Sequence, residues 1–410
     1  MKNLVIIGGG TAGTTMSNKL IRYLPADEWK ITIIERAREH FYQPGFLFIP
    51  FGYYSRDQIT KPAKKFFPKG VDVIDNEVDL IMPDNNQINL KDGTSLAYDI
   101  LLIATGTRIC PEDTPGLKGE LWQKNVFDFY TIEGAEALAG FFKTWEGGNL
   151  VINIADNPIK CPVAPLEFSF YADDFFTKKG IRDKVKITYV TPMSGAFTKP
   201  KASKFLGDLL NRKNIKIVTD FFLGEVDNVN KKILDFGGSE VPFDCLVTIP
   251  LHSGDPVISK SGLGDEFGFV KADKNTLQSL SYKNIFVIGD ASNLPTSKAG
   301  SVAHFQADVL HDNILSFIKN EPLKASFDGH SNCYIETGHG KGILIDFNYD
   351  TEPLPGVFPV PGIGPFSLLK ESRINHWGKL FFKWMYWNLL LRGRWIPIPS
   401  RMSMKGKIAD

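Results

Sequence analysis

Short apolar runs alternate with helical patterns through the first half of the chain, and this alternation predicts an α/β fold. The segment KNLVIIGGGTAGTTMSNKLIRYL begins with an apolar strand at residues 4–7, passes through glycines and continues as a helix. A second apolar strand, WKITIIE, follows and ends in Glu35. A strand, a glycine turn, a helix and a second strand in this order indicate a βαβ unit with parallel strands.

Later segments extend this pattern into two Rossmann-like units and a C-terminal module. YDILLIATGTR (98–108) and YKNIFVIGDAS (282–292) are strands that end in small residues. Between them NLVINIAD (149–156), KVKITYVTP and the helix-strand pair KASKFLGDLLNRKNIKIVTD indicate a second α/β unit. We predict a discontinuous first unit at 1–115 and 245–320, a second at 116–244, and a third region at 321–410.

Composition narrows the class of protein. The chain has 410 residues, 43% hydrophobic and 23% charged, enough for two or three domains with buried cores. No apolar run approaches the roughly 18 residues of a membrane-spanning helix, so any membrane attachment should be peripheral. Nothing at the N-terminus resembles a signal peptide, which favours the cytoplasmic side of a membrane. No nucleic-acid partner is expected.

Charge and cysteine content add two constraints. The net charge of +1 is uneven, because residues 370–410 hold nine Lys or Arg against two acids, a net +7. The four cysteines are widely spaced and never form a CxxC pair, which argues against a zinc cluster or a disulfide-rich secreted scaffold. We therefore predict no metal site and ask instead whether any cysteine is redox-active.

The first glycine turn predicts a dinucleotide site. Gly8, Gly10 and Gly13 fit the pattern G-x-G-x-x-G, in which glycines permit a tight turn, close approach of a pyrophosphate and close helix packing. Thr11 and Ala12 open the helix, whose N-terminus provides N–H donors. Glu35 lies about 20 residues on, where a carboxylate can bind ribose hydroxyls. The motif alone leaves NAD and FAD both open.

Two later motifs favour FAD. Thr105 and Gly106 in the first, and Gly289 and Asp290 in the second, resemble signatures of the FAD-dependent pyridine-nucleotide disulfide reductase superfamily. The resemblance implies that Asp290 binds the flavin ribityl chain; the alternative is that these residues are ordinary turns at strand ends. Members of that superfamily usually carry a second glycine loop for NAD(P)H, and here the glycines after residues 149–156 are absent. NADH is therefore a poor candidate for the electron donor.

Cys161 takes the place of those glycines, in NPIKCPVAPLEF, just before a helix that begins near 162–165. A thiolate at a helix N-terminus is stabilised by the dipole, which would lower the pKa of the thiol. The alternative is a buried small apolar residue. Only tertiary structure can bring Cys333 close to Cys161. If both flank the flavin, they form a redox disulfide that a sulfur nucleophile opens, leaving a persulfide and a thiolate.

Four segments, KCPVAPLEF, TSKAGSVAHF, CYIETG and FNYDTEPLPGVFPVPGIGPFSLLKES, together resemble the sulfide:quinone oxidoreductase family, in particular its prokaryotic type III branch. The resemblance implies that Cys161 and Cys333 oxidise sulfide to polysulfide and reduce FAD, which reduces a membrane quinone. It places Lys298 near the flavin and makes Glu167 a candidate for proton handling. A third cysteine common in the family is missing, so covalent attachment of FAD is left open; Cys110 is interpreted as structural and Cys245 as core.

The C-terminal region is the candidate quinone and membrane site. Aromatic residues cluster among prolines and glycines after Cys333, as a quinone slot requires, although core packing would explain any single one: Phe347, Tyr349, Phe358 and Phe366. In the amphipathic helix expected at 376–395, His376, Lys379, Lys383 and Tyr386 share one face and tryptophans occupy others. This composition predicts membrane contact, with the cations at anionic headgroups. The alternative is that the helix is buried in a dimer interface. Homo-oligomerisation is left open.

We therefore interpret the chain as a peripheral, monotopic flavoprotein that oxidises sulfide and reduces quinone. Two rivals remain. A type II NADH:quinone dehydrogenase would need an intact second glycine loop, and a non-catalytic flavin-binding membrane scaffold would not depend on its cysteines. A flavocytochrome-type sulfide dehydrogenase is closer to the favoured interpretation than either rival. Such a protein would be exported, and the lack of a signal peptide argues against it.

Overall fold

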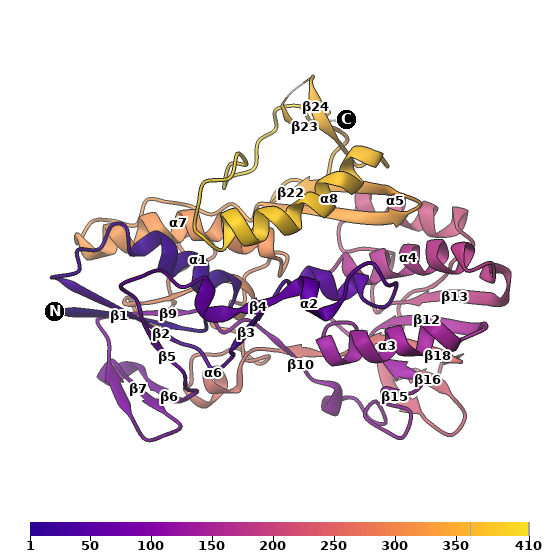
Figure 1. Cartoon of the computed structure of the whole chain (residues 1–410), viewed down its shortest axis with the longest axis horizontal. Coiled ribbons are helices and arrows are strands. Elements are labelled where there is room, and N and C mark those ends of the chain that lie inside the picture. Colours follow the sequence, from indigo (N-terminus) through magenta and orange to yellow (C-terminus); the bar gives the residue numbers. More distant parts are fainter. Residues whose placement is uncertain (361, 409–410) are drawn as a thin grey trace.

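Two parallel sheets form the frame of the computed structural model, which describes residues 1–360 and 362–408 (Figure 1). The first sheet has five parallel strands in the order β20 (Ile285–Val287), β9 (Ile100–Ile103), β1 (Lys2–Ile7), β2 (Trp29–Ile34) and β5 (Asp72–Ile74). Helices α1 (Thr11–Leu20) and α7 (Gly300–Ile318) lie side by side against it. The α/β prediction and the joining of distant segments in one sheet are confirmed.

The second sheet is also parallel, in the order β11 (Val126–Phe127), β18 (Cys245–Ile249), β12 (Gly148–Ile154), β13 (Val185–Val190) and β14 (Lys216–Val218). Its helices are α3 (Ile132–Thr144), α4 (Ala164–Lys178) and α5 (Pro200–Arg212). Strand β18 is wholly buried and pairs with β12 from Leu150 to Ile154. The expected boundary at residue 245 therefore moves to 249, because β18 is an inner strand of the second sheet. Cys245 is fully buried there, in the core as predicted.

Smaller antiparallel elements lie outside the two parallel sheets. They are β3 (Glu39–Phe41) with β4 (Thr60–Pro62); β6 (Val78–Met82), β7 (Gln87–Leu90) and β8 (Ser95–Ala97); β10 (Arg108–Ile109) with β19 (His252–Ser253); and β15 (Leu223–Asp227), β16 (Lys232–Asp235) and β17 (Glu240–Pro242). Two short helices, α2 (Arg56–Ile59) and α6 (Pro256–Lys260), complete this part of the chain.

The C-terminal region forms a mixed sheet in the order β21 (Ser331–Gly338), β22 (Lys341–Phe347), β24 (Gly364–Leu368) and β23 (Gly356–Val360). Helix α8 (Arg373–Met385) packs on this sheet and is capped by Ser372, whose Oγ accepts the N–H of Asn375. The sequence predicted a helix over residues 376–395. The α-helix ends earlier, at Met385, because a π-helical turn follows at Tyr386–Leu390. Within the described residues, no helix has the length and apolarity needed to span a bilayer.

The chain then returns to the first unit and docks on α1. Side chains one turn apart on α1 donate to consecutive backbone carbonyls of this C-terminal segment. Thr15 bonds the carbonyl of Leu390 at 3.1 Å and Asn18 bonds that of Leu391 at 3.1 Å. One turn further, Arg22 bonds the carbonyl of Arg392 at 2.6 Å. Hydrogen bonds thus connect the region of α1 to the C-terminal segment at residues 390–392.

Candidate active site

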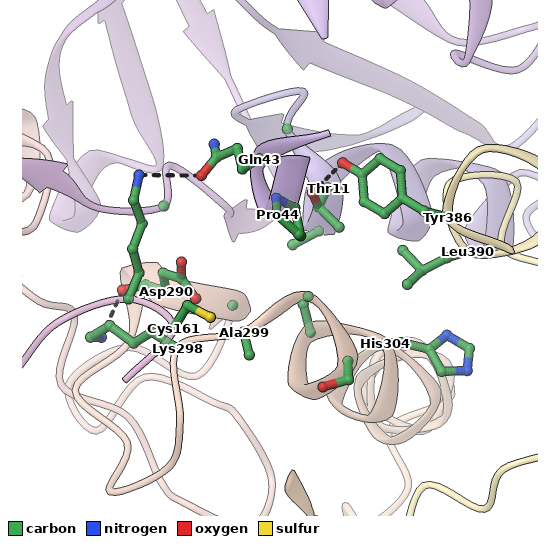
Figure 2. Close-up of a pocket in the computed structure, with 18 of the residues that line it drawn as sticks. Thr11, Gln43, Pro44, Cys161, Asp290, Lys298, Ala299, His304, Tyr386 and Leu390 are labelled. Atoms are coloured by element: carbon green, nitrogen blue, oxygen red, sulfur yellow. Dashed lines mark hydrogen bonds between the residues drawn. The ribbon is translucent and has the colours of Figure 1, made fainter. Parts of the chain in front are cut away.

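A cavity of about 730 Å³ lies where the two units and the C-terminal region meet (Figure 2). It brings together residues that are more than 300 positions apart in the sequence. The residues predicted from sequence that line it are Gly8, Gly10, Thr11, Ala12, Glu35, Thr105, Gly106, Cys161, Glu167, Gly289, Asp290, Lys298, Cys333, Phe358 and Phe366.

The glycine loop has the backbone that a pyrophosphate site requires. Gly8 has φ +96, and a Cβ there would lie 2.5 Å from the carbonyl oxygen of Ala104. A Cβ on Gly13 would lie 1.9 Å from the oxygen of Gly8, so Gly13 permits close packing of α1 beneath the loop. A Cβ on Gly10 would meet nothing within 4 Å. The protein itself needs Gly8 and Gly13, whereas Gly10 leaves open space where a ligand can approach.

This difference gives a prediction. Gly13→Ala is expected to lower the free energy of unfolding of the flavin-free protein by about 3 kcal/mol or more, because the new methyl overlaps Gly8. Gly10→Ala should change it by only about 1 kcal/mol and should instead weaken retention of a dinucleotide. Denaturant unfolding and the flavin absorbance left after gel filtration separate the two effects. Undiminished flavin in Gly10→Ala would show that the loop does not hold the pyrophosphate.

Two further features of the cavity fit a dinucleotide. The Glu35 carboxylate is held by backbone N–H groups, since Oε2 accepts from Gly9 and Oε1 from Ala37, both at 2.6 Å. Each oxygen keeps lone pairs for a ribose hydroxyl. The hydroxyl of Thr105 is buried on the cavity wall and has no hydrogen-bond partner among the described residues. Such a buried hydroxyl is satisfied when a polar ligand fills the cavity.

Cys161 lies in the turn between β12 and α4, in a left-handed conformation with φ +50. This costs a non-glycine residue on the order of 1 kcal/mol, and hydrogen bonds hold it in place. The Cys161 N–H donates to the carbonyl of Lys298 at 2.7 Å, and its carbonyl accepts from Ala164 N–H at 2.9 Å. The Tyr130 hydroxyl also donates to that carbonyl, at 3.3 Å. The turn is therefore fixed between the two units.

Packing of α4 against β21 brings Cys333 to the same cavity. Cys333 is buried in β21, and the N–H of Glu336 in that strand donates to Oε1 of Glu167 in α4 at 2.9 Å. Both cysteines are free thiols. The structure therefore brings together the two cysteines that the sequence could only nominate.

The prediction of a lowered thiol pKa is wrong for this structure. Burial and the carboxylate of Glu167 raise the pKa of Cys161 to about 12, against the opposing effects of Lys379 and the Ala164 N–H. Burial and the neighbouring Cys161 also raise the pKa of Cys333, and Lys379 again opposes the shift. The helix N-terminus is too weak to offset removal of the thiols from water.

Lys379 is the cation that acts on both thiols. Its Nζ donates to both oxygens of Glu167, at 2.8 and 3.1 Å, and to the carbonyl of Tyr334 at 3.2 Å. Burial alone would lower the pKa of Lys379, but Glu167 and Cys161 raise it above its ordinary value. The buried ammonium is thus held charged beside the two cysteines.

Lys298 braces the segment that contains Asp290. Its Nζ donates to the carbonyl of Asp290 at 2.8 Å (Figure 2). It also donates to the carbonyl of Ser292 at 2.8 Å and lies 3.8 Å from the centre of the Phe269 ring. Burial lowers the pKa of Lys298 to about 8. Lys298 therefore lines the cavity and also holds the backbone at Asp290 and Ser292 in place.

Comparison with known proteins gives the family. Residues 2–151 match the family "Pyridine nucleotide-disulphide oxidoreductase". A mitochondrial sulfide:quinone oxidoreductase of Dictyostelium discoideum is 32% identical over 96% of this chain and 86% of its own length. One from Schizosaccharomyces pombe is 30% identical over 96% and 90%.

The chain belongs to the sulfide:quinone oxidoreductase family. The fold agrees, because the solved structure of the sulfide:quinone oxidoreductase from Aquifex aeolicus superposes with a TM-score of 0.78, covering 96% of this chain and 92% of that one at 23% identity. The pyridine nucleotide-disulphide oxidoreductases, within which the sulfide:quinone oxidoreductase family lies, are in general FAD-binding flavoproteins. The glycine loop, Glu35 and Thr105 suit such a cofactor.

Of the four aromatic residues that the sequence of this family member suggests for a quinone site, two line the cavity and two do not. Phe358 and Phe366 are opposite each other in β23 and β24 and line the cavity. Phe347 and Tyr349 lie outside it. Phe347 belongs to the buried core, with Lys199 Nζ 5.5 Å from its ring centre. Tyr349 packs on Phe327 and donates its hydroxyl to the carbonyl of Lys274.

Sequence reasoning missed several residues of the cavity wall. Tyr386 is one: its hydroxyl lies 2.8 Å from Oγ1 of Thr11, at the glycine loop (Figure 2). The same hydroxyl lies 2.6 Å from Nε2 of His40. His304 of α7 is another, and both of its ring nitrogens are buried without a partner among the described residues. No local motif marks Tyr386, whereas His304 lies within the segment TSKAGSVAHF, which drew attention to Lys298 instead. Cys110 is fully buried, with Sγ 3.2 Å from Oγ of Ser253, which agrees with a structural role.

The sequence predicted that the cations of α8 face a membrane, but two of them face the protein interior. Lys379 points inward to Glu167, and His376 Nδ1 lies 2.8 Å from Oε2 of Glu336. Three aromatic side chains face outward: Trp377, Phe381 and Trp384 are 66, 55 and 52% exposed. Lys379 is therefore not available to a membrane surface, and the outward face of α8 is aromatic.

Proposed function

We propose that this protein oxidises sulfide to polysulfide or sulfur with FAD and the Cys161–Cys333 pair, and reduces a membrane quinone. The observation that carries the proposal is that both cysteines line one cavity with the dinucleotide loop and with Phe358 and Phe366. Family membership supports the same reaction. The finer assignments of residues to roles are part of the proposal.

The cysteines carry the sulfur chemistry. When the pair is oxidised to a disulfide, hydrosulfide attacks one sulfur, the S–S bond breaks, and one cysteine becomes a persulfide while the other leaves as a thiolate. Lys379 stabilises this thiolate, because it lowers the pKa of both thiols. Bound FAD supplies the two-electron acceptor that passes electrons on to a quinone. Glu167 holds Lys379 in position and is the candidate for exchanging protons with it.

The quinone would lie against the apolar side chains of the C-terminal region that line the cavity. They include Phe358, Phe366, Phe382, Ile396 and Ile398. The exposed aromatic face of α8 suits the interface of a bilayer, where tryptophan rings are favourable. We therefore propose that the protein attaches peripherally to a membrane, with α8 in contact with lipid.

Anaerobic reduction of the purified holoprotein tests the function. Sulfide is expected to bleach the flavin absorbance, NADH is not, and a soluble quinone should restore it. The physical reason is that the turn at 155–163, where NADH would need a glycine loop, contains no glycine. Bleaching by NADH with indifference to sulfide would indicate a type II NADH:quinone dehydrogenase instead. Bleaching by neither would favour a non-catalytic scaffold.

A further inference from the structure

A group of cations gathers beside α8, around two stacked aromatic rings. Phe66 and Trp387 stack with ring centres 5.1 Å apart. Lys61 Nζ lies 4.5 Å from the centre of the Trp387 ring, and the guanidinium of Arg392 lies 5.3 Å from that of Phe66. With Lys65 and Lys383, these cations are called the basic patch: Lys61, Lys65, Lys383 and Arg392.

The basic patch has no acidic partner. None of the ion pairs found among the described residues includes any of its four members. The nearby Arg56, by contrast, pairs with Glu39. Burial lowers the pKa of Lys61, and the positive charges of the other three members lower it further. Uncompensated cations this close together repel one another, and an anion would relieve the repulsion.

A buried donor points to the same need. The indole N–H of Trp387, at the centre of the basic patch, is buried and finds no acceptor in the part of the chain that is described. Buried N–H groups in folded proteins nearly always have an acceptor. Phosphate oxygens are strong acceptors and carry the charge that the four cations lack.

The exposed aromatic face of α8 identifies the source of that phosphate. Lys383 lies in the same helix as Phe381 and Trp384, whose rings stack 5.3 Å apart and are more than half exposed. Apolar rings next to cations match the two layers of a bilayer surface, in which acyl chains lie below a plane of phosphates. A soluble anion would neutralise the cations but would give the exposed rings nothing apolar to contact, whereas a lipid surface does both.

We propose that the basic patch binds the phosphate headgroups of anionic phospholipids while the α8 aromatic face enters the lipid. This deepens the membrane attachment assigned under the proposed function and rests on it. Because each cation at a membrane surface strengthens binding several-fold, the preference for anionic over neutral vesicles should be on the order of 10²-fold. Salt should reduce this preference by screening.

Vesicle sedimentation of the full-length holoprotein tests the proposal. One set of vesicles is phosphatidylcholine alone and the other contains added phosphatidylglycerol. The variant Lys61→Gln/Lys383→Gln/Arg392→Gln should lose the anionic preference but retain binding to neutral vesicles. A matched control, Lys184→Gln/Lys186→Gln/Lys216→Gln, removes three exposed cations from the second unit and should keep the preference. Flavin content and melting temperature confirm that both variants are folded.

Each failure has a separate meaning. Equal binding of the unaltered protein to both vesicles would overturn the headgroup proposal and leave the membrane attachment standing. The same proposal fails if the patch variant keeps its anionic preference. If the unaltered protein sediments with neither vesicle, the proposed attachment itself is wrong. Quinone reduction with a soluble acceptor should be unchanged in the patch variant.

Discussion

Cys161→Ser and Cys333→Ser are each expected to slow sulfide-dependent quinone reduction by on the order of 10³-fold or more. A serine hydroxyl cannot form the disulfide that hydrosulfide opens, so neither single variant retains a route for the electron pair. Both residues line the dinucleotide cavity, and no other cysteine does. Stopped-flow bleaching of the flavin under anaerobic conditions measures the step directly, before quinone is added.

Cys110→Ala is the matched control for these variants. Cys110 is buried against Ser253 and away from the cavity wall, so its loss should leave the rate of flavin bleaching within about twofold, as is usual away from a reacting centre. Retention of full sulfide-dependent bleaching in either serine variant would remove the corresponding cysteine from the mechanism. An equal loss in Cys110→Ala would show that the effect is structural.

Lys379→Met is expected to lower the free energy of unfolding by roughly 3–5 kcal/mol, because it leaves Glu167 buried without its cation. It should also impair turnover. Lys379 lowers the pKa of Cys161 and Cys333, so its removal raises both and moves the active pH range upward. At neutral pH we expect a loss of about tenfold or more, since each unit of pKa changes the thiolate population tenfold. Denaturant unfolding and pH profiles of flavin bleaching give the two effects.

The double variant Glu167→Gln/Lys379→Met separates charge from packing. It removes both charges of this pair and leaves neither residue buried as an unpaired ion, so much of the lost stability should return. Glu167→Gln alone should lower the pKa of Cys161, because the carboxylate raises it. Lys383→Met, one turn along α8, should change stability by no more than about 1 kcal/mol. A stability loss in Lys379→Met that Glu167→Gln fails to rescue would contradict the ion-pair explanation.

The sequence predicted the parts of the site that depend on local patterns. The turn containing Gly8 and Gly13 requires those residues for steric reasons that act over a few positions, so the glycine spacing was enough to place it. The motif resemblance nominated Cys161 and Cys333. Their shared cavity depends on packing of α4 against β21, a contact between segments more than 160 residues apart that spacing alone does not encode.

The direction in which α8 faces could not be predicted from its pattern. An amphipathic pattern defines two faces and does not say which one contacts the protein. Buried acids at Glu167 and Glu336 attract Lys379 and His376 inward, and these acids belong to other elements. In the same way, Phe358 and Phe366 reach the cavity while Phe347 does not, because the pairing of the strands in the folded sheet decides which aromatic side chains point inward.

The hydrogen bonds from α1 to the C-terminal segment have a consequence for biosynthesis. Thr11, Thr15 and Asn18 are synthesised more than 370 residues before their partners Tyr386, Leu390 and Leu391. The glycine loop can fold early, but the wall that contains Tyr386 and Ile396 is missing until those residues have been translated. Capture of the flavin should therefore be a post-translational event, and nascent chains stalled before residue 386 should bind it weakly.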